Sequence, residues 1–319
     1  MHALTAQRLA VGYRAGRDTV IIADDLNLAL RQGELTCLLG QNGAGKSTLL
    51  RTLAGAQPPL AGEILLGGQR LRDLSPRELA RRLSIVTTER VDAAMMTGRM
   101  LVALGRQPHT DWTGQLGPQD ERAVSQALAQ VGGEPLADRR LSQMSDGERQ
   151  RMMIARAVAQ ESTVMLLDEP TAFLDLPRRI ETMRLLRQIA HSARRAVLVS
   201  THDLDLALRL ADVVWLMTPH EALAQGAPED LVLNGAFSRA FAREGVVFDA
   251  QTGTFEVTTP THSTVRLAGE GARRYWTQRA LLRAGWAVGE TGPLVTISER
   301  GWTLNGQEHS TLRALLEAL

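Results

Sequence analysis

Short apolar runs, each followed by a polar cluster, recur along the first two thirds of this 319-residue chain. Residues 34–39, 163–167 and 196–199 are three of them, and each has the length and composition of a strand buried on both faces. Segments with helical character lie between them, such as residues 47–54, where Gly55 is suited to end the helix. Strands that alternate with helices predict a parallel sheet whose ligand lies at the carboxyl ends of the strands.

The first run leads into a segment that fits G-x-x-x-x-G-K-[ST], the phosphate-binding loop. Backbone N–H groups of such a loop cradle nucleotide phosphates, a lysine reaches the β/γ oxygens, and the following helix points its N-terminus at them. Lys46 is the only lysine among the 36 Lys and Arg residues, which indicates that the loop requires the compact ammonium of lysine. We therefore expect a nucleoside triphosphate to be bound by Gly40, Gln41, Asn42, Gly43, Ala44, Gly45, Lys46, Ser47 and Thr48.

Two later strands end in groups that suit the same ligand. Asp168 and Glu169 follow the run at residues 163–167, and His202 follows the run at 196–199. In a P-loop enzyme the first carboxylate helps to hold Mg²⁺, together with the loop hydroxyl of Ser47, and the second can polarise the attacking water. We expect Glu169, His202 and Lys46 to be catalytic, with His202 contacting the γ-phosphate.

The segment Ser-Asp-Gly-Glu-Arg-Gln at residues 145–150 resembles the signature motif of ABC-type ATPases. Ser145 is a good helix N-cap with Glu148 three residues on, and Gly147 lets a backbone approach a phosphate closely. The resemblance implies an α/β fold: a RecA-like core, an antiparallel β subdomain and a helical subdomain at about residues 88–160. It covers about residues 1–245, and we expect the ATPase domain to extend over residues 1–257.

This resemblance also implies residue roles and a dimer. Tyr13 matches the aromatic residue that stacks on adenine, and Asp175 lies in the loop through which two protomers communicate. Two copies would pack head to tail around ATP and Mg²⁺. The signature of one copy would then close over the ATP of the other, using Ser145, Asp146, Gly147 and Glu148.

One motif departs from the family pattern. The strand at residues 83–86 should lead to a glutamine that touches Mg²⁺ and moves with the membrane partner, but the chain has no glutamine there. Alignment without gaps places Thr88 at that position, and a shift of one residue places Glu89 there. Either side chain has an oxygen to offer to Mg²⁺, with Glu89 the preferred metal ligand.

The segment Gly-Arg-Gln-Pro-His at residues 105–109 and the turn at 171–177 resemble importers of iron-siderophore chelates, haem and cobalamin. This resemblance implies polytopic transmembrane permease subunits, a separate substrate-binding protein, and a position at the cytoplasmic face of the inner (plasma) membrane. The alternatives are a soluble ABC ATPase acting on nucleic acid or ribosomes, an exporter or transporter with another cargo, and a non-hydrolytic regulator. The first usually has two nucleotide domains or long coiled-coil insertions, which this chain lacks.

Composition adds few constraints. The net charge of +1 gives no reason to expect a nucleic-acid partner, and the single Cys37 fits a reducing compartment. No stretch approaches about 18 uninterrupted apolar residues, and residues 1–4 do not form an apolar signal core.

From about residue 258 the amino-acid composition changes, and a Thr- and Pro-rich linker is followed by a small α+β module. We expect strands at 264–268, 294–298 and 302–305, and helices at 272–284 and 310–319. About 60 residues is near the lower limit for an independent core. The module at residues 258–319 either strengthens the dimer or senses a small ligand, or it is a structural appendage.

Overall fold

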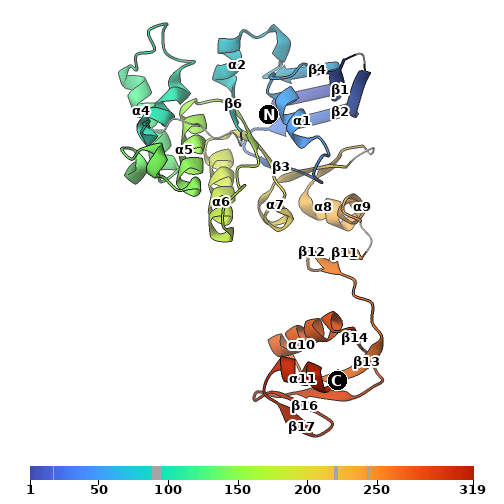
Figure 1. The fold of residues 1–319 in the computed structure, drawn as a ribbon. Coiled ribbons are helices and arrows are strands. Elements are labelled where there is room, and N and C mark those ends of the chain that lie inside the picture. Colours follow the sequence, from blue (N-terminus) through green and yellow to red (C-terminus); the bar gives the residue numbers. More distant parts are fainter. Residues whose placement is uncertain (17, 88–94, 219–221, 243–244) are drawn as a thin grey trace. The chain divides into compact units, whose positions relative to one another are not determined.

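The computed structural model describes residues 1–16, 18–87, 95–218, 222–242 and 245–319 (Figure 1). Internal contacts divide the chain into two units: residues 1–241 with 250–254, and residues 242–249 with 255–319. The boundary predicted at residue 257 lies within the segment 255–319 of the second unit. None of the helices formed by the described residues is both long and apolar enough to cross a membrane.

The centre of the first unit is a six-stranded sheet of order β10-β9-β3-β8-β7-β6. Neighbouring strands are parallel except for β10, which is antiparallel to β9. The predicted apolar runs form the middle strands because each is buried on both faces. The strands are β3 (Leu35–Gly40), β6 (Leu83–Val86), β7 (Val164–Asp168), β8 (Ala196–Ser200), β9 (Val213–Met217) and β10 (Ala224–Gly226). The accompanying helices are α1 (Lys46–Leu53), α6 (Leu176–Ser192), α7 (Leu204–Leu210), α8 (Pro228–Leu233) and α9 (Ala236–Ala240).

An antiparallel sheet of order β2-β1-β4-β5 forms the predicted β subdomain. Its apolar side chains join those of the core sheet and α1 in one buried cluster, which includes Leu4, Leu9, Leu38, Leu49 and Leu166. The strands are β1 (His2–Ala15), β2 (Asp18–Arg31), β4 (Ala61–Leu66) and β5 (Gln69–Arg70), followed by η1 (Leu71–Asp73) and α2 (Pro76–Arg82). Figure 1 shows this sheet at one end of the unit and α4 and α5 at the other.

The helical subdomain follows the core strand β6, as predicted. It contains α3 (Gly98–Ala103), η2 (Leu104–Arg106), α4 (Pro118–Gln130), η3 (Glu134–Leu136), η4 (Leu141–Gln143) and α5 (Asp146–Ala159). Helix α4 packs through one apolar face, on which Ala123, Ala127 and Leu128 are buried.

Arg106, from the Gly-Arg-Gln-Pro-His segment, holds this subdomain together. Its side chain is only 2% exposed, and its guanidinium donates to Asp120 (2.9 Å), Glu161 (2.6 Å) and the Ala159 carbonyl oxygen (2.7 Å). His109 Nε2 lies 2.9 Å from the Gln160 carbonyl oxygen. The segment that resembles the chelate importers is thus a buried hub between α4 and the end of α5.

The second unit has its own core around a five-stranded sheet of order β14-β13-β15-β16-β17. Val265, Leu281, Val295, Leu304 and Leu315 are buried there, and the Trp302 indole donates to Thr277 Oγ1 at 2.7 Å. The elements are β13 (Ser263–Ala268), α10 (Gly271–Arg283), β14 (Trp286–Val288), β15 (Leu294–Ile297), β16 (Trp302–Leu304), β17 (Gln307–His309) and α11 (Leu312–Ala318). The hairpin β11 (Val246–Asp249) and β12 (Thr254–Val257) precedes them. The sequence interpretation included neither this hairpin nor the short edge strands β14 and β17.

Candidate functional site

The loop between β3 and α1 has the backbone that its glycines require. Gly43 and Gly45 have φ of 81° and 97°, in the left-handed region that favours glycine. A Cβ on Gly45 would lie 2.2 Å from Ile22 Cγ2, and one on Gly40 would lie 2.3 Å from the Met217 carbonyl oxygen. The glycine spacing is therefore imposed by backbone conformation and by close neighbours as well as by any ligand.

Lys46 is the first residue of α1, and its side chain turns back across the loop. Its ammonium donates to the carbonyl oxygens of Gly40 (2.9 Å) and Gln41 (3.2 Å), and the residue is 6% exposed. Burial lowers the pKa of this ammonium, while the nearby carboxylates of Glu169 and Asp168 oppose the shift. Lys46, Asp168 and Glu169 thus lie close enough to interact electrostatically. Their roles in catalysis and metal binding stay predictions.

Ser200 links the two carboxylate residues at the end of β7. Its hydroxyl donates to Asp168 Oδ1 at 2.6 Å and accepts from the Glu169 backbone N–H at 2.9 Å. Asp168 and Ser200 are paired across the parallel strands β7 and β8. Sequence reasoning assigned no role to Ser200, whose full burial at the end of β8 is seen only in the structure.

Glu169 adopts a backbone conformation that is uncommon for a residue with a side chain, with φ of 47°. Its carboxylate lies 2.5 Å from His202 Nε2, and both side chains are partly exposed. The two residues line a cavity of about 210 Å³ together with Thr171, Ala172, Arg179, Thr201 and Asp203. The expected base and the expected γ-phosphate contact are thus in direct contact.

Other expected nucleotide-binding residues lie around the same loop. Asn42 is exposed, Ala44 is buried, and Ser47 and Thr48 are partly exposed near the start of α1. Gln41 is tied to α9 because its amide donates to the Ala240 carbonyl oxygen at 2.9 Å. Tyr13 is half exposed near the end of β1, which suits stacking on a base. Thr88 and Glu89 lie outside the described residues.

The signature segment begins α5 with a capping box, as its sequence predicts. The Ser145 hydroxyl accepts from the Glu148 N–H at 3.3 Å, and Glu148 accepts from the Ser145 N–H at 2.8 Å. Hydrogen bonds that the Glu148 carboxylate accepts from Ser145, first that from the backbone N–H, lower the pKa of Glu148, and Arg139 lowers it further. Asp146 and Gly147 therefore occupy the first turn of the helix, where N–H groups face outward.

Asp175 caps α6 and accepts from the Arg178 N–H at 3.1 Å. Phe173, in the turn before it, has φ of 64° and is 80% exposed. The Arg178 guanidinium reaches from α6 to α5 and donates to Ser145 Oγ at 3.0 Å.

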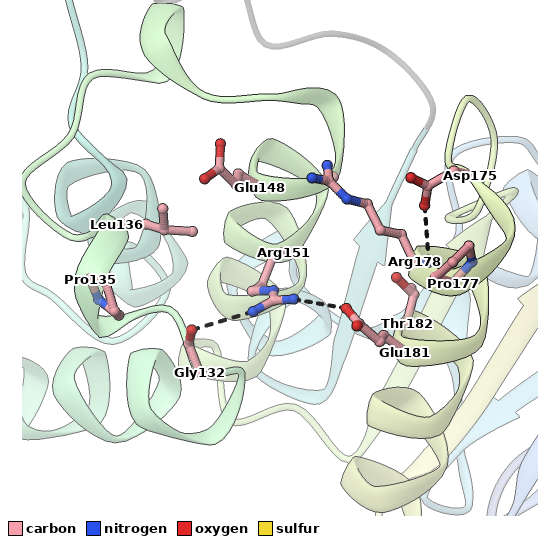
Figure 2. Close-up of a pocket in the computed structure, with 11 residues that line it drawn as sticks. Gly132, Pro135, Leu136, Glu148, Arg151, Asp175, Pro177, Arg178, Glu181 and Thr182 are labelled. Atoms are coloured by element: carbon pink, nitrogen blue, oxygen red, sulfur yellow. Dashed lines mark hydrogen bonds and ion pairs between the residues drawn. The ribbon is translucent and has the colours of Figure 1, made fainter.

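Figure 2 shows Arg178 above a cavity of about 470 Å³ between the two helices, which the Arg151–Glu181 ion pair crosses lower down. This cavity is lined by Gly147, Glu148 and Asp175 but by none of Lys46, Asp168, Glu169 and His202. The structure therefore brings together two separate groups of predicted residues within one chain.

Comparison with known proteins identifies the chain. Residues 23–172 match the ABC transporter family, and residues 261–319 match the iron ABC transporter C-terminal domain. An ABC transporter ATP-binding protein of Methanocaldococcus jannaschii is 40% identical over 254 residues, which is 80% of this chain and 86% of that protein. The chain belongs to the ATP-binding subunits of ABC transporters. It is therefore an ATP-binding protein and an ATPase.

Other relatives of this ABC ATPase have named cargoes. The achromobactin transport ATP-binding protein CbrD of Dickeya dadantii is 40% identical over 232 residues, covering 73% of this chain and 85% of that protein. The cobalamin import ATP-binding protein BtuD of Halobacterium salinarum is 37% identical over 282 residues, covering 86% of this chain and 70% of that protein. Among solved structures, a metal-chelate type ABC transporter in an inward-facing conformation is 28% identical, with a TM-score of 0.65, covering 76% of this chain and 89% of that chain.

Proposed function

We propose that this ABC ATPase drives import of an iron-siderophore, haem or cobalamin-type chelate through partner transmembrane subunits. The observation that carries the proposal is the match of residues 261–319 to an iron ABC transporter domain, on a chain whose ATPase relatives include siderophore and cobalamin importers. The buried hub around Arg106 supports it, because the segment that resembles these importers has a defined structural role here.

The proposed chemistry starts from the loop at residues 40–48. Its N–H groups and the Lys46 ammonium bind the β/γ phosphates, with Tyr13 stacking on adenine. When ATP binds, the Lys46 ammonium exchanges its hydrogen bonds to two backbone carbonyl oxygens for hydrogen bonds to phosphate oxygens. This exchange is favourable because the phosphate oxygens are anionic. Glu169 accepts a proton from the attacking water, and His202 holds the γ-phosphate while orienting the Glu169 carboxylate.

Mg²⁺ fits the donors that this edge of the sheet offers. Among the described residues no group of three or more His, Cys, Asp or Glu side chains could hold a metal by itself. Mg²⁺ is ordinarily bound by one or two carboxylates together with substrate phosphates and water, so a complete protein cage is not required. The Ser47 hydroxyl and the Asp168 carboxylate would hold it, with an oxygen of Thr88 or Glu89 at the loop position. The ion would neutralise charge on the β/γ phosphates.

The proposed working unit is a head-to-tail homodimer. Residues 145–148 of one copy would cover the ATP bound to the other, with the turn around Asp175 passing contacts between the two sites. This is supported by the separation of the two groups of residues, which line different cavities within one copy. Closure would exclude water from the γ-phosphate and link hydrolysis to a movement of the partner permease.

The helical subdomain is the proposed contact with the membrane subunits, which would hold the ATPase at the cytoplasmic face of the inner membrane. Its surface exposes large apolar side chains, including Met95, Met100 and Trp112. Such exposed apolar side chains are available for contact with a protein partner. A substrate-binding protein would be an indirect partner through the permease.

Co-purification tests the proposal. The tagged chain is isolated from gently solubilised membranes of its native host, and proteins present in comparable amount are identified by mass. We expect a polytopic membrane protein, whose own substrate-binding partner would name the cargo. Recovery of the chain alone, or with ribosomes or DNA, would instead indicate a soluble ABC ATPase.

A matched pair of variants locates the contact. Met100→Glu places a charge on the exposed face of α3 and should remove the membrane protein while ATP binding persists. Leu233→Glu changes an even more exposed apolar residue of α8, outside the helical subdomain. This variant should still co-purify with the membrane protein. Equal retention by both variants would argue against the proposed contact surface.

A further inference from the structure

We propose that Arg178 is an additional ligand of the γ-phosphate in the composite ATP site. In the closed dimer, the guanidinium of one copy would bind the terminal phosphate held by the phosphate-binding loop of the other. The inference rests on the proposed head-to-tail dimer and adds to it a residue outside the sequence motifs.

The position of Arg178 points to this role. Its Nη1 donates to Ser145 Oγ at 3.0 Å, and its side chain lies against Gly147. A Cβ on Gly147 would stand 2.8 Å from Nη1 and 3.0 Å from Cδ, so glycine at this position admits the arginine. A phosphate oxygen bound by Ser145 would lie about 3 Å from Oγ, hence within about 6 Å of the guanidinium.

The charge of Arg178 has no counter-ion in the described part of the chain. No carboxylate there lies within ion-pair distance of the Arg178 guanidinium, which donates to the neutral hydroxyl of Ser145. Guanidinium presents five donors in a fork that matches phosphate oxygens, so most of its hydrogen-bonding capacity is unused here. The cavity beneath it, about 470 Å³ in volume, gives the side chain room to adjust to an arriving phosphate (Figure 2).

The same contact has a second interpretation, in which Arg178 blocks the signature until ATP displaces it. Electrostatics favours the ligand. If Arg178 blocked the signature, its cationic guanidinium would have to leave as the anionic phosphate arrives. If Arg178 is a ligand, it exchanges the neutral Ser145 hydroxyl for an anionic phosphate oxygen, with which it forms stronger hydrogen bonds. The two roles predict opposite effects of removing the side chain.

The test measures ATP-dependent dimerisation of the full chain in a Glu169→Gln background by analytical ultracentrifugation. Adding Arg178→Ala should raise the dissociation constant of the ATP-bound dimer about 100-fold, because each of two sites loses about tenfold, a typical factor for one charge-assisted hydrogen bond. Arg178→Lys should recover part of this loss. Arg184→Ala, which removes an exposed arginine of the same helix, should have no effect.

ADP binding by single chains and the melting temperature separate this role from a structural one. Both should be unchanged in Arg178→Ala, since ADP lacks the γ-phosphate and the side chain is exposed. A dimer as tight as the parent would overturn the proposal, and a tighter dimer would establish the blocking role instead. If the Glu169→Gln parent does not dimerise with ATP, the composite site itself is wrong and the proposal fails with it.

Discussion

Replacing Ser200 by alanine tests whether the hydroxyl beneath the carboxylates sets the geometry of hydrolysis. Ser200 is fully buried, and its hydroxyl joins Asp168 Oδ1 to the Glu169 N–H. Alanine fits the same space without a donor or an acceptor. The Asp168 carboxylate then loses a hydrogen bond and the Glu169 N–H loses its acceptor.

The magnitude follows from these two hydrogen bonds. A hydrogen bond to a charged carboxylate contributes about 1.5–3 kcal/mol, and an N–H left without an acceptor costs about 1 kcal/mol or more. The left-handed backbone of Glu169 stores about 1–2 kcal/mol, which this N–H hydrogen bond helps to offset. Without it the residue relaxes and its carboxylate moves, and a displacement of about 1 Å costs about 100-fold in turnover.

The assay compares kcat, ATP affinity and unfolding free energy for Ser200→Ala and a matched buried serine. Ser162 is 1% exposed at the opposite end of β7, where its hydroxyl contacts Ser84 and the Val164 carbonyl oxygen. Ser162→Ala also removes a buried hydroxyl that makes hydrogen bonds, so it should destabilise the fold but leave kcat unchanged. Ser200→Ala should lower kcat about 100-fold, or about 2.7 kcal/mol in the barrier, with ATP affinity within about threefold of the parent (under 1 kcal/mol).

A Ser200→Ala enzyme with normal kcat would refute this reasoning, because it would mean that Glu169 is positioned by other contacts. An equal loss of kcat in both variants would trace the effect to general destabilisation. A large loss of ATP affinity would place the role of Ser200 in binding rather than in hydrolysis.

Four further predictions concern the ATP site and the C-terminal module. Glu169→Gln removes the proposed base and should trap an ATP-bound dimer with little turnover; normal turnover would contradict that role. Gly45→Ala forces a side chain onto φ of 97° and into Ile22, so calorimetry should detect no ATP binding by a chain that still folds. Lys46→Arg keeps the charge but cannot make the same pair of carbonyl contacts, and ATP affinity should fall at least about tenfold, a change of about 1.4 kcal/mol. Deleting residues 261–319 removes a unit with its own core and should leave ATPase activity intact, while dimerisation or the response to the imported compound changes. If neither changes, the deleted module is a structural appendage.

Much of the ATPase fold could be predicted from sequence because its middle strands are buried on both faces. Such strands need uninterrupted apolar runs, and the residues after Leu39, Leu167 and Val199 are then the natural places for chemistry. The short strands β14 and β17 were not predicted. Each has only three residues, and its position in the sheet depends on neighbouring strands rather than on local pattern.

The supporting residues were harder to predict than the motif residues. Ser200 acts through hydrogen bonds that exist only when β7 and β8 are in register, and Arg178 reaches Ser145 across 33 positions of sequence. Side chains of these types are usually solvated, so sequence alone gives little reason to select them. The left-handed backbone of Glu169 is likewise a consequence of the turn after β7 and not of its residue type.

The strengths of the contacts around α5 indicate where the ATPase unit is easiest to rearrange. At its C-terminal end, Arg106 joins Ala159, Glu161 and Asp120 through a nearly inaccessible guanidinium, so separating these groups would leave a buried charge unpaired. At its N-terminal end, α5 meets α6 across a cavity, through the Arg178 hydrogen bond and the exposed Arg151–Glu181 pair. An exposed ion pair contributes only about 0–1 kcal/mol. Movement of the signature relative to α6 therefore costs less free energy than movement within the helical subdomain. This difference is required if the helical subdomain transmits closure of the ATP site as one rigid body.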